Sequence, residues 1–118
     1  MAEDIRIDSH KLVYHPETVA KWLKGENIYP IEIEISPSGI CNHRCVFCAV
    51  DYVGYKPRFL DKDVILRDIR HMSKKGLKSV ICSGEGEPFL NQNMPDMANS
   101  IKACGVDVAV STNGVLFT

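Results

Sequence analysis

Three cysteines stand close together near the middle of the chain, at positions Cys41, Cys45 and Cys48. Their spacing, C-x3-C-x2-C, lets one short loop direct three sulfurs toward a single centre. Three thiolates ligate three irons of a [4Fe–4S] cube and leave the fourth iron without a protein ligand. Because that open iron can take a small molecule, the loop indicates chemistry at a metal centre and not only electron storage.

Other uses of cysteine fit this pattern less well. Structural zinc usually takes four Cys or His ligands, often as two separated C-x2-4-C pairs, whereas Cys82 and Cys104 lie far from the other three. His43 is a candidate fourth ligand, but its place inside the loop makes a tetrahedron awkward to close. Five cysteines is an odd number for disulfide pairing. Zinc stays open as the alternative to an iron–sulfur cluster.

The chain has 118 residues, of which 45% are hydrophobic and 25% are charged. This composition is typical of one small globular domain. The net charge of −1 provides no overall field toward nucleic acid or a membrane surface. No apolar run approaches the roughly 20 residues of a transmembrane helix. Unpaired thiols favour a reducing, cytoplasmic location.

The elements around the cysteine loop alternate between strands and helices. Alternating or buried β-type runs predict three strands, at residues 31–36, 79–82 and 106–110. Apolar stripes predict helices between them, at 62–75 with Asp61 as N-cap, and from Asn93 or Met94 to Cys104. This order implies right-handed crossovers and a parallel α/β sheet. In the first strand, Glu32 and Glu34 face away from the isoleucines, toward a barrel lumen or toward solvent.

Two further loops follow the second and third strands. They are Ser83-Gly-Glu-Gly-Glu-Pro88 and Ser111-Thr-Asn-Gly114. Glycines let a backbone approach a ligand closely, although either loop could also be a plain turn. Because parallel α/β sheets bind ligands at the carboxyl ends of their strands, we expect both loops to lie beside the cysteines.

Together the three motifs resemble the radical S-adenosylmethionine (SAM) superfamily. The family signature C-x3-C-x-aromatic-C matches the cysteine loop, with Phe47 as the aromatic residue. Its G-G-E-P motif is similar to Gly84-Glu-Gly-Glu-Pro88, where Glu85 replaces the first glycine of the family's pair. Its T-N-G motif is similar to the loop after the third strand. The resemblance covers about residues 31–118.

The resemblance implies an enzyme with a [4Fe–4S] cluster on Cys41, Cys45 and Cys48 and with SAM on the unique iron. Reductive cleavage of SAM gives a 5′-deoxyadenosyl radical, which abstracts hydrogen from an unknown small-molecule or peptide substrate. An external electron donor is implied as well. The alternative is a non-catalytic module that binds structural zinc or an electron-transfer iron–sulfur cluster.

The resemblance also assigns residues to SAM. Glu87 and the backbone of Gly84, Glu85 and Gly86 are expected near the SAM amino group, because an ammonium needs carboxylate and carbonyl acceptors. The backbone of Phe47 is expected at the adenine, with its ring packed. Thr112 and Asn113 are candidate SAM contacts.

The domain organisation follows from the same resemblance. Residues 1–30 are an N-terminal extension with a short helix from Pro16 to Lys24, preceded by alternating segments at Ile5–Ile7 and Leu12–Tyr14 that suit a strand or an ordered arm. Residues 31–118 are the first three strands of a partial (β/α) barrel, half of a six-unit core. We therefore expect part of a longer enzyme, inactive or nearly so alone. The alternative is that a partner chain or self-association covers the exposed sheet edge.

Overall fold

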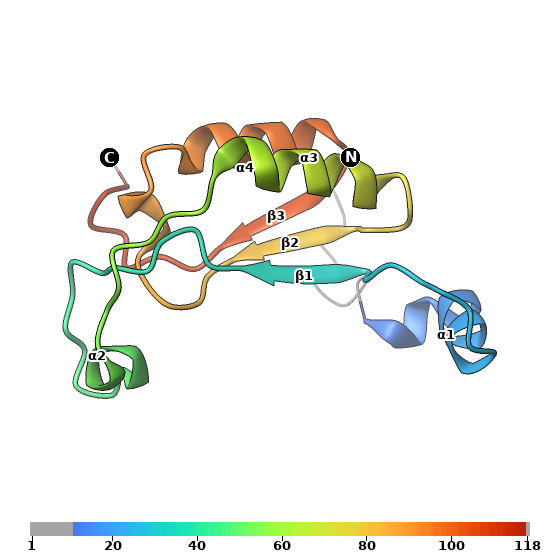
Figure 1. Ribbon diagram of the computed structural model, residues 1–118, viewed down its shortest axis with the longest axis horizontal. Helices are drawn as coiled ribbons and strands as arrows, with labels where there is room; N and C mark the ends of the chain where they lie inside the picture. Colours follow the sequence, from blue (N-terminus) through green and yellow to red (C-terminus); the bar gives the residue numbers. More distant parts are fainter. Residues whose placement is uncertain (1–10, 118) are drawn as a thin grey trace, which may run out of the picture.

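The computed structural model describes residues 11–117, in which a parallel sheet carries helices on one face (Figure 1). Strands β1 (Glu32–Ile35), β2 (Ser79–Cys82) and β3 (Asp107–Val110) lie in sequence order, with β2 in the centre. The register pairs Ile35 with Cys82 and Cys82 with Val110, so the strands end level with one another. Helices α3 (Lys62–Ser73) and α4 (Met94–Ala103) cover the sheet. The parallel α/β sheet predicted from the sequence is confirmed.

The hydrophobic core lies between the sheet and this helix layer. Val80 at the centre of β2 is fully buried, as are Ile69 of α3 and Met97 and Ile101 of α4. Buried positions recur at helical spacing in both helices, so each helix packs one apolar stripe on the sheet. Burial of these side chains holds the strands in register and thereby fixes where their loops begin.

Most element boundaries agree with the sequence predictions to within two residues. Asp61 caps α3 as expected, because its Oδ1 accepts a hydrogen bond from the Val64 backbone N–H at 3.0 Å. Two short elements were not predicted from the sequence, helix α2 (Ala49–Val53) and the 3-10 turn η3 (Pro88–Leu90). Both are too short to show an apolar period.

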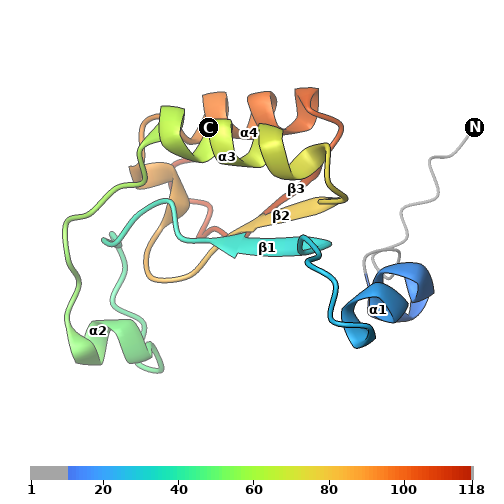
Figure 2. The same cartoon turned by 45° about the vertical axis from the view of Figure 1, so that its right-hand side comes forward.

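Residues 11–30 lie at the opposite end of the sheet from the cysteine loop (Figure 2). Helix α1 (Pro16–Leu23) begins as predicted and ends one residue earlier. Its apolar side is exposed, with Trp22 62% and Leu23 74% accessible. The strand alternative for Leu12–Tyr14 is wrong, because these residues form the 3-10 turn η2. The other alternating segment, Ile5–Ile7, lies outside the described residues.

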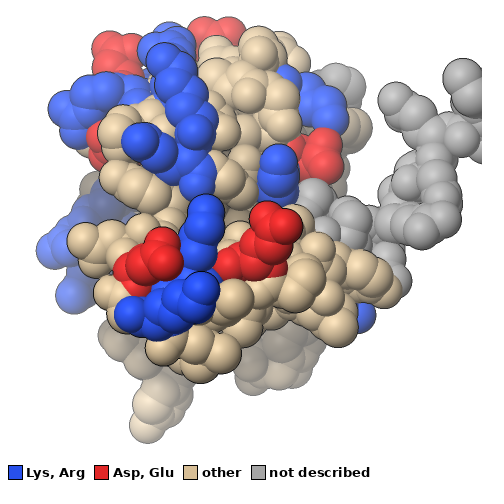
Figure 3. All heavy atoms as spheres, turned by 90° about the vertical axis from the view of Figure 1, so that its right-hand side faces the viewer, with Lys and Arg blue, Asp and Glu red and all other residues tan. Residues whose placement is uncertain are grey.

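Charged side chains of both signs are mixed on the face around the N-terminal ends of the strands (Figure 3). This mixture agrees with the small net charge of the chain. Within residues 11–117, no helix combines the length and the apolar character that a bilayer crossing requires.

The sheet face opposite the helices carries the acidic side chains of β1. Glu32 Oε2 accepts a hydrogen bond from the Ser79 hydroxyl at 2.8 Å, and Glu34 Oε1 accepts one from the Ser83 hydroxyl. Alternation along the strand sends the intervening isoleucines to the core side. The glutamates therefore lie on the open face, where Glu32 is hydrogen-bonded to β2 and Glu34 to the residue that follows β2.

Gly86 allows two loops to run in backbone contact at the carboxyl edge of the sheet. A Cβ atom added there would lie 2.2 Å from the Ile40 carbonyl oxygen and 2.6 Å from that of Ser38. The next residue, Glu87, donates its N–H to the same Ile40 carbonyl at 2.9 Å. Only a residue without a side chain fits between these atoms.

We predict that Gly86→Ala lowers the free energy of unfolding by about 1–3 kcal/mol, because the added methyl group must displace backbone. Urea unfolding of the two proteins measures the difference. Glu85→Ala, at the exposed neighbouring position, is the matched control and should leave the midpoint nearly unchanged. Equal midpoints for all three proteins would contradict the close approach.

Candidate functional site

The loops that follow the three strands meet at the carboxyl edge of the sheet (Figure 1). Strand pairing extends one step into the second and third loops. The Ser83 N–H donates to the Ile35 carbonyl, and the Ser111 N–H donates to the Cys82 carbonyl, both at 2.9 Å. The loops therefore begin level, and the side chains that follow can reach one another.

Glu87 joins the second loop to the third. Its side chain is only 2% exposed. Oε1 accepts hydrogen bonds from the Thr112 hydroxyl at 2.7 Å and from the Phe89 N–H at 3.1 Å. Oε2 accepts a hydrogen bond from the Asn113 N–H at 2.8 Å. A buried carboxylate needs such donors, because an unpaired charge is costly away from water. Three of its roughly four acceptor positions are thus used within the chain, and one direction on Oε2 is left.

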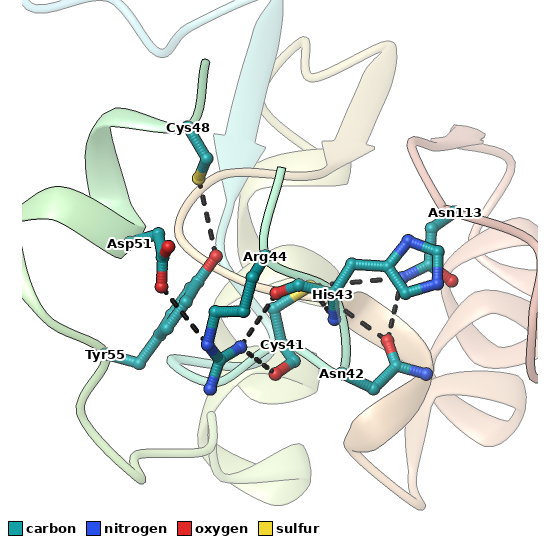
Figure 4. A network of polar contacts seen from close by, with 8 residues as sticks. All are labelled: Cys41, Asn42, His43, Arg44, Cys48, Asp51, Tyr55 and Asn113. Atoms are coloured by element: carbon teal, nitrogen blue, oxygen red, sulfur yellow. Dashed lines mark hydrogen bonds and ion pairs between the residues drawn. The ribbon is translucent and has the colours of Figure 1, made fainter. Parts of the chain in front are cut away.

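Asn113 then joins the third loop to the first. Its Nδ2 donates to Asn42 Oδ1 at 2.7 Å and lies 3.9 Å from Cys41 Sγ (Figure 4). The motifs predict that Glu87, Thr112 and Asn113 lie around a shared ligand. In the structure they also contact each other directly. No sequence pattern indicated that contact.

A second network holds the far end of the cysteine loop (Figure 4). The Arg44 guanidinium donates through Nη1 to the Cys41 and His43 carbonyls, each at 2.7 Å, and its Nε lies 3.1 Å from Asp51 Oδ1. The same guanidinium lies over the Tyr55 ring, 4.7 Å from its centroid. Arg44 therefore links the first half of the loop to α2 and to the residues beyond it.

Cys48 lies against Tyr55, with 3.4 Å between the sulfur and the hydroxyl oxygen. The hydrogen bond from Tyr55 lowers the pKa of the Cys48 thiol, and a backbone hydrogen bond from Asp51 acts in the same direction. The same contact raises the pKa of Tyr55. These shifts favour a Cys48 thiolate beside a protonated tyrosine, and a thiolate is the form that binds metal.

The five cysteines are all free thiols, but only three suit a shared metal centre. Cys82 belongs to the core, and burial raises its pKa to about 11. Among residues 11–117, no three Cys, His, Asp or Glu side chains are yet close enough together to hold a metal ion. The donor set of the exposed loop fits an iron–sulfur cluster, and the three sulfurs must draw together to hold one.

Family comparison agrees with this arrangement of loops. The family model described as the radical SAM superfamily matches residues 35–118, more than half of the chain. The chain belongs to the radical SAM superfamily. The match includes all three loops of the carboxyl edge.

Named relatives in the superfamily differ in their reactions. A GTP 3′,8-cyclase from Stenotrophomonas maltophilia is 34% identical over 71% of this chain and 27% of its own length. A 7-carboxy-7-deazaguanine synthase from Rhodopirellula baltica is 27% identical over 96% of this chain and 43% of its own length. The chain therefore spans less than half of either relative.

A solved structure confirms the fold. Streptococcus suis SuiB, bound to the precursor peptide SuiA, matches the whole chain with a TM-score of 0.69 at 22% identity, over 27% of its own length. The parallel sheet with helices on one face thus agrees with the predicted fold, the first three strands of a partial (β/α) barrel.

The remaining superfamily motif positions lie at the same edge. Gly84 has a φ of +98°, a conformation that suits glycine, and the exposed Glu85 donates its N–H to the Ser36 hydroxyl at 3.0 Å. Phe47 is 86% exposed, so the prediction that its ring packs is wrong. The aromatic residue of the signature faces outward because it stands between two cysteines on a loop that leaves the sheet.

Removal of the Thr112 hydroxyl should loosen the third loop. We predict that Thr112→Val raises the hydrogen-exchange rate of the Asn113 amide roughly fivefold, equivalent to about 1 kcal/mol, because the Glu87 carboxylate loses one of its anchors. NMR exchange measurements read this amide directly. Thr112→Ser keeps the hydroxyl and should keep the wild-type rate. If the valine and serine variants exchange alike, Glu87 does not depend on this hydrogen bond.

Proposed function

We propose that the chain forms the first three strand–helix units of a radical SAM enzyme core that binds a [4Fe–4S] cluster and SAM. The connection between the three loops carries this proposal. Glu87 of the second loop holds Thr112 and Asn113 of the third, and Asn113 reaches Cys41 of the first. A structural metal site needs only its own loop, whereas a cofactor that contacts three loops requires them to be joined.

Cys41, Cys45 and Cys48 are the proposed cluster ligands. They are the three thiols outside the core that share one loop, and three thiolates leave one iron open for a second ligand. Cluster and SAM together supply a one-electron cleavage that yields a 5′-deoxyadenosyl radical for hydrogen abstraction. The protein's part is to hold both groups at one edge, and the hydrogen bond from Tyr55 lowers the pKa of the Cys48 thiol, which favours its thiolate.

The second and third loops are the proposed SAM contacts. The backbone of Gly84, Glu85 and Gly86 offers carbonyl oxygens to an ammonium group, and Oε2 of Glu87 has one acceptor direction left for it. Thr112 and Asn113 are held beside this carboxylate by their own hydrogen bonds, Thr112 to Oε1 and Asn113 to Oε2. The backbone of Phe47 is proposed to contact the adenine.

The proposed substrate class is drawn from the names of the relatives and of the structural neighbour. The relatives' names include a GTP cyclase and a deazaguanine synthase, and the structural neighbour is bound to a precursor peptide. A small molecule or a peptide is therefore the proposed substrate, and an external one-electron donor is the proposed partner. The small net charge and the thiol set support a cytoplasmic protein without a nucleic-acid or membrane partner.

The proposed domain organisation divides the chain into two parts. Residues 1–30 form an extension to the core, and residues 31–118 form the first half of the partial barrel. β1 and β3 are the outer strands of the described sheet. Further strands of a barrel, or a second copy of the chain, would complete hydrogen bonding along these edges.

Anaerobic reconstitution with iron and sulfide tests the cluster. We expect about four irons and four sulfides per chain, and an electron paramagnetic resonance (EPR) spectrum of the reduced protein that changes when SAM is added. Cys45→Ser should lose most of the bound iron, because one of three ligands is removed. Cys104→Ser, at the end of α4, is the matched control and should retain it.

Other results would point to the non-catalytic alternative. Stoichiometric zinc in place of iron would indicate a structural metal site. A cluster whose EPR spectrum ignores SAM would indicate electron transfer alone. Equal iron in the Cys45→Ser and Cys104→Ser variants would show that the loop is not the ligand set.

A further inference from the structure

Tyr55 stands seven residues beyond the last cysteine, yet its hydroxyl contacts that cysteine's sulfur. The oxygen lies 3.4 Å from Cys48 Sγ, and both side chains are partly buried (Figure 4). Tyr52, only three positions earlier, has a side chain that is 94% exposed. The contact therefore belongs to one tyrosine of the segment and is not a general property of its aromatic residues.

The ring of Tyr55 is held in this position by charge. The Arg44 guanidinium lies 4.7 Å from the ring centroid, and the same group is fixed by Asp51 and by the Cys41 and His43 carbonyls. A cation over an aromatic face is attractive, and five donors on a rigid plane allow arginine to make all these contacts at once. Tyr55 thus has a stable orientation with its hydroxyl directed at sulfur.

A hydrogen bond to a ligand sulfur has a definite effect on an iron–sulfur cluster. Reduction adds negative charge that spreads onto the thiolates, so a donor to sulfur stabilises the reduced form more than the oxidised one. Hydrogen bonds to the sulfurs are among the main determinants of cluster potential. Within residues 11–117, Cys48 Sγ is the one hydrogen-bond partner of the Tyr55 hydroxyl, so the hydroxyl proton is available to that sulfur.

We propose that the Tyr55 hydroxyl donates a hydrogen bond to the Cys48 thiolate of the bound cluster and raises the cluster's reduction potential. Arg44 and Asp51 are positioning residues that hold the tyrosine ring. The proposal rests on the proposed cluster site. It adds that this chain makes its cluster easier to reduce by an external one-electron donor than the three cysteines alone would.

Tyr55→Phe tests the proposal, because it keeps the ring beneath Arg44 and removes only the hydroxyl. The reconstituted chain is titrated with a one-electron reductant, and the reduced cluster is followed by EPR. We expect a lower midpoint potential for Tyr55→Phe than for the wild type. Tyr52→Phe, the same change on an exposed side chain, should keep the wild-type potential.

Proton electron–nuclear double resonance on the reduced cluster gives a second, direct readout. The wild type and Tyr52→Phe should show a coupled proton that exchanges in deuterated water, and Tyr55→Phe should lack that proton. A purely structural role for the tyrosine would not remove one exchangeable proton selectively.

Several results would overturn the proposal. They are an unchanged potential in Tyr55→Phe, equal shifts in both tyrosine variants, an unchanged proton spectrum, or loss of the cluster from Tyr55→Phe alone, which would assign the hydroxyl to assembly. If the wild-type chain itself binds no iron–sulfur cluster, the proposed function fails first and this inference fails with it. The iron and sulfide content of the wild type distinguishes the two failures.

Discussion

The buried carboxylate of Glu87 is the interaction on which the arrangement of the site depends. It accepts hydrogen bonds from its own turn through Phe89 and from the next loop through Thr112 and Asn113. Because a buried charge is stable only with its donors in place, separating the second and third loops costs free energy. Asn113 then carries the connection to Cys41. The protein thus joins the second loop, the third loop and Cys41 before any ligand contributes, whereas the three sulfurs still have to draw together.

Much of the fold could be predicted from the sequence, because local signals agreed with the global arrangement. β2 was predicted at its observed boundaries, since a short buried run stands between Gly76 and Gly84. Asp61 indicated the start of α3, because aspartate is a favoured N-cap residue. The core stripe of α4 followed from helical spacing. Where the hydrophobic periodicity and the residues that end an element indicated the same boundaries, the structure has the predicted element.

The features that the sequence did not reveal depend on tertiary contacts. Helix α2 is a single turn without an apolar stripe, and the exposure of Trp22 and Phe47 depends on what lies opposite each ring. The motifs indicated which residues gather at the edge. They did not indicate that Glu87 is held by its neighbours or that Tyr55, rather than Tyr52, contacts a cysteine. Such pairings join loops that are distant in sequence, and no spacing rule specifies them.

Mössbauer spectroscopy of the chain loaded with iron-57 tests the central claim most directly, because it observes each iron of the cluster. Three cysteine ligands predict that one quarter of the iron forms a distinct site, whose isomer shift alone changes when SAM binds. Four equivalent irons that ignore SAM, or iron bound singly, would contradict an edge built from three loops to present an open iron to a cofactor.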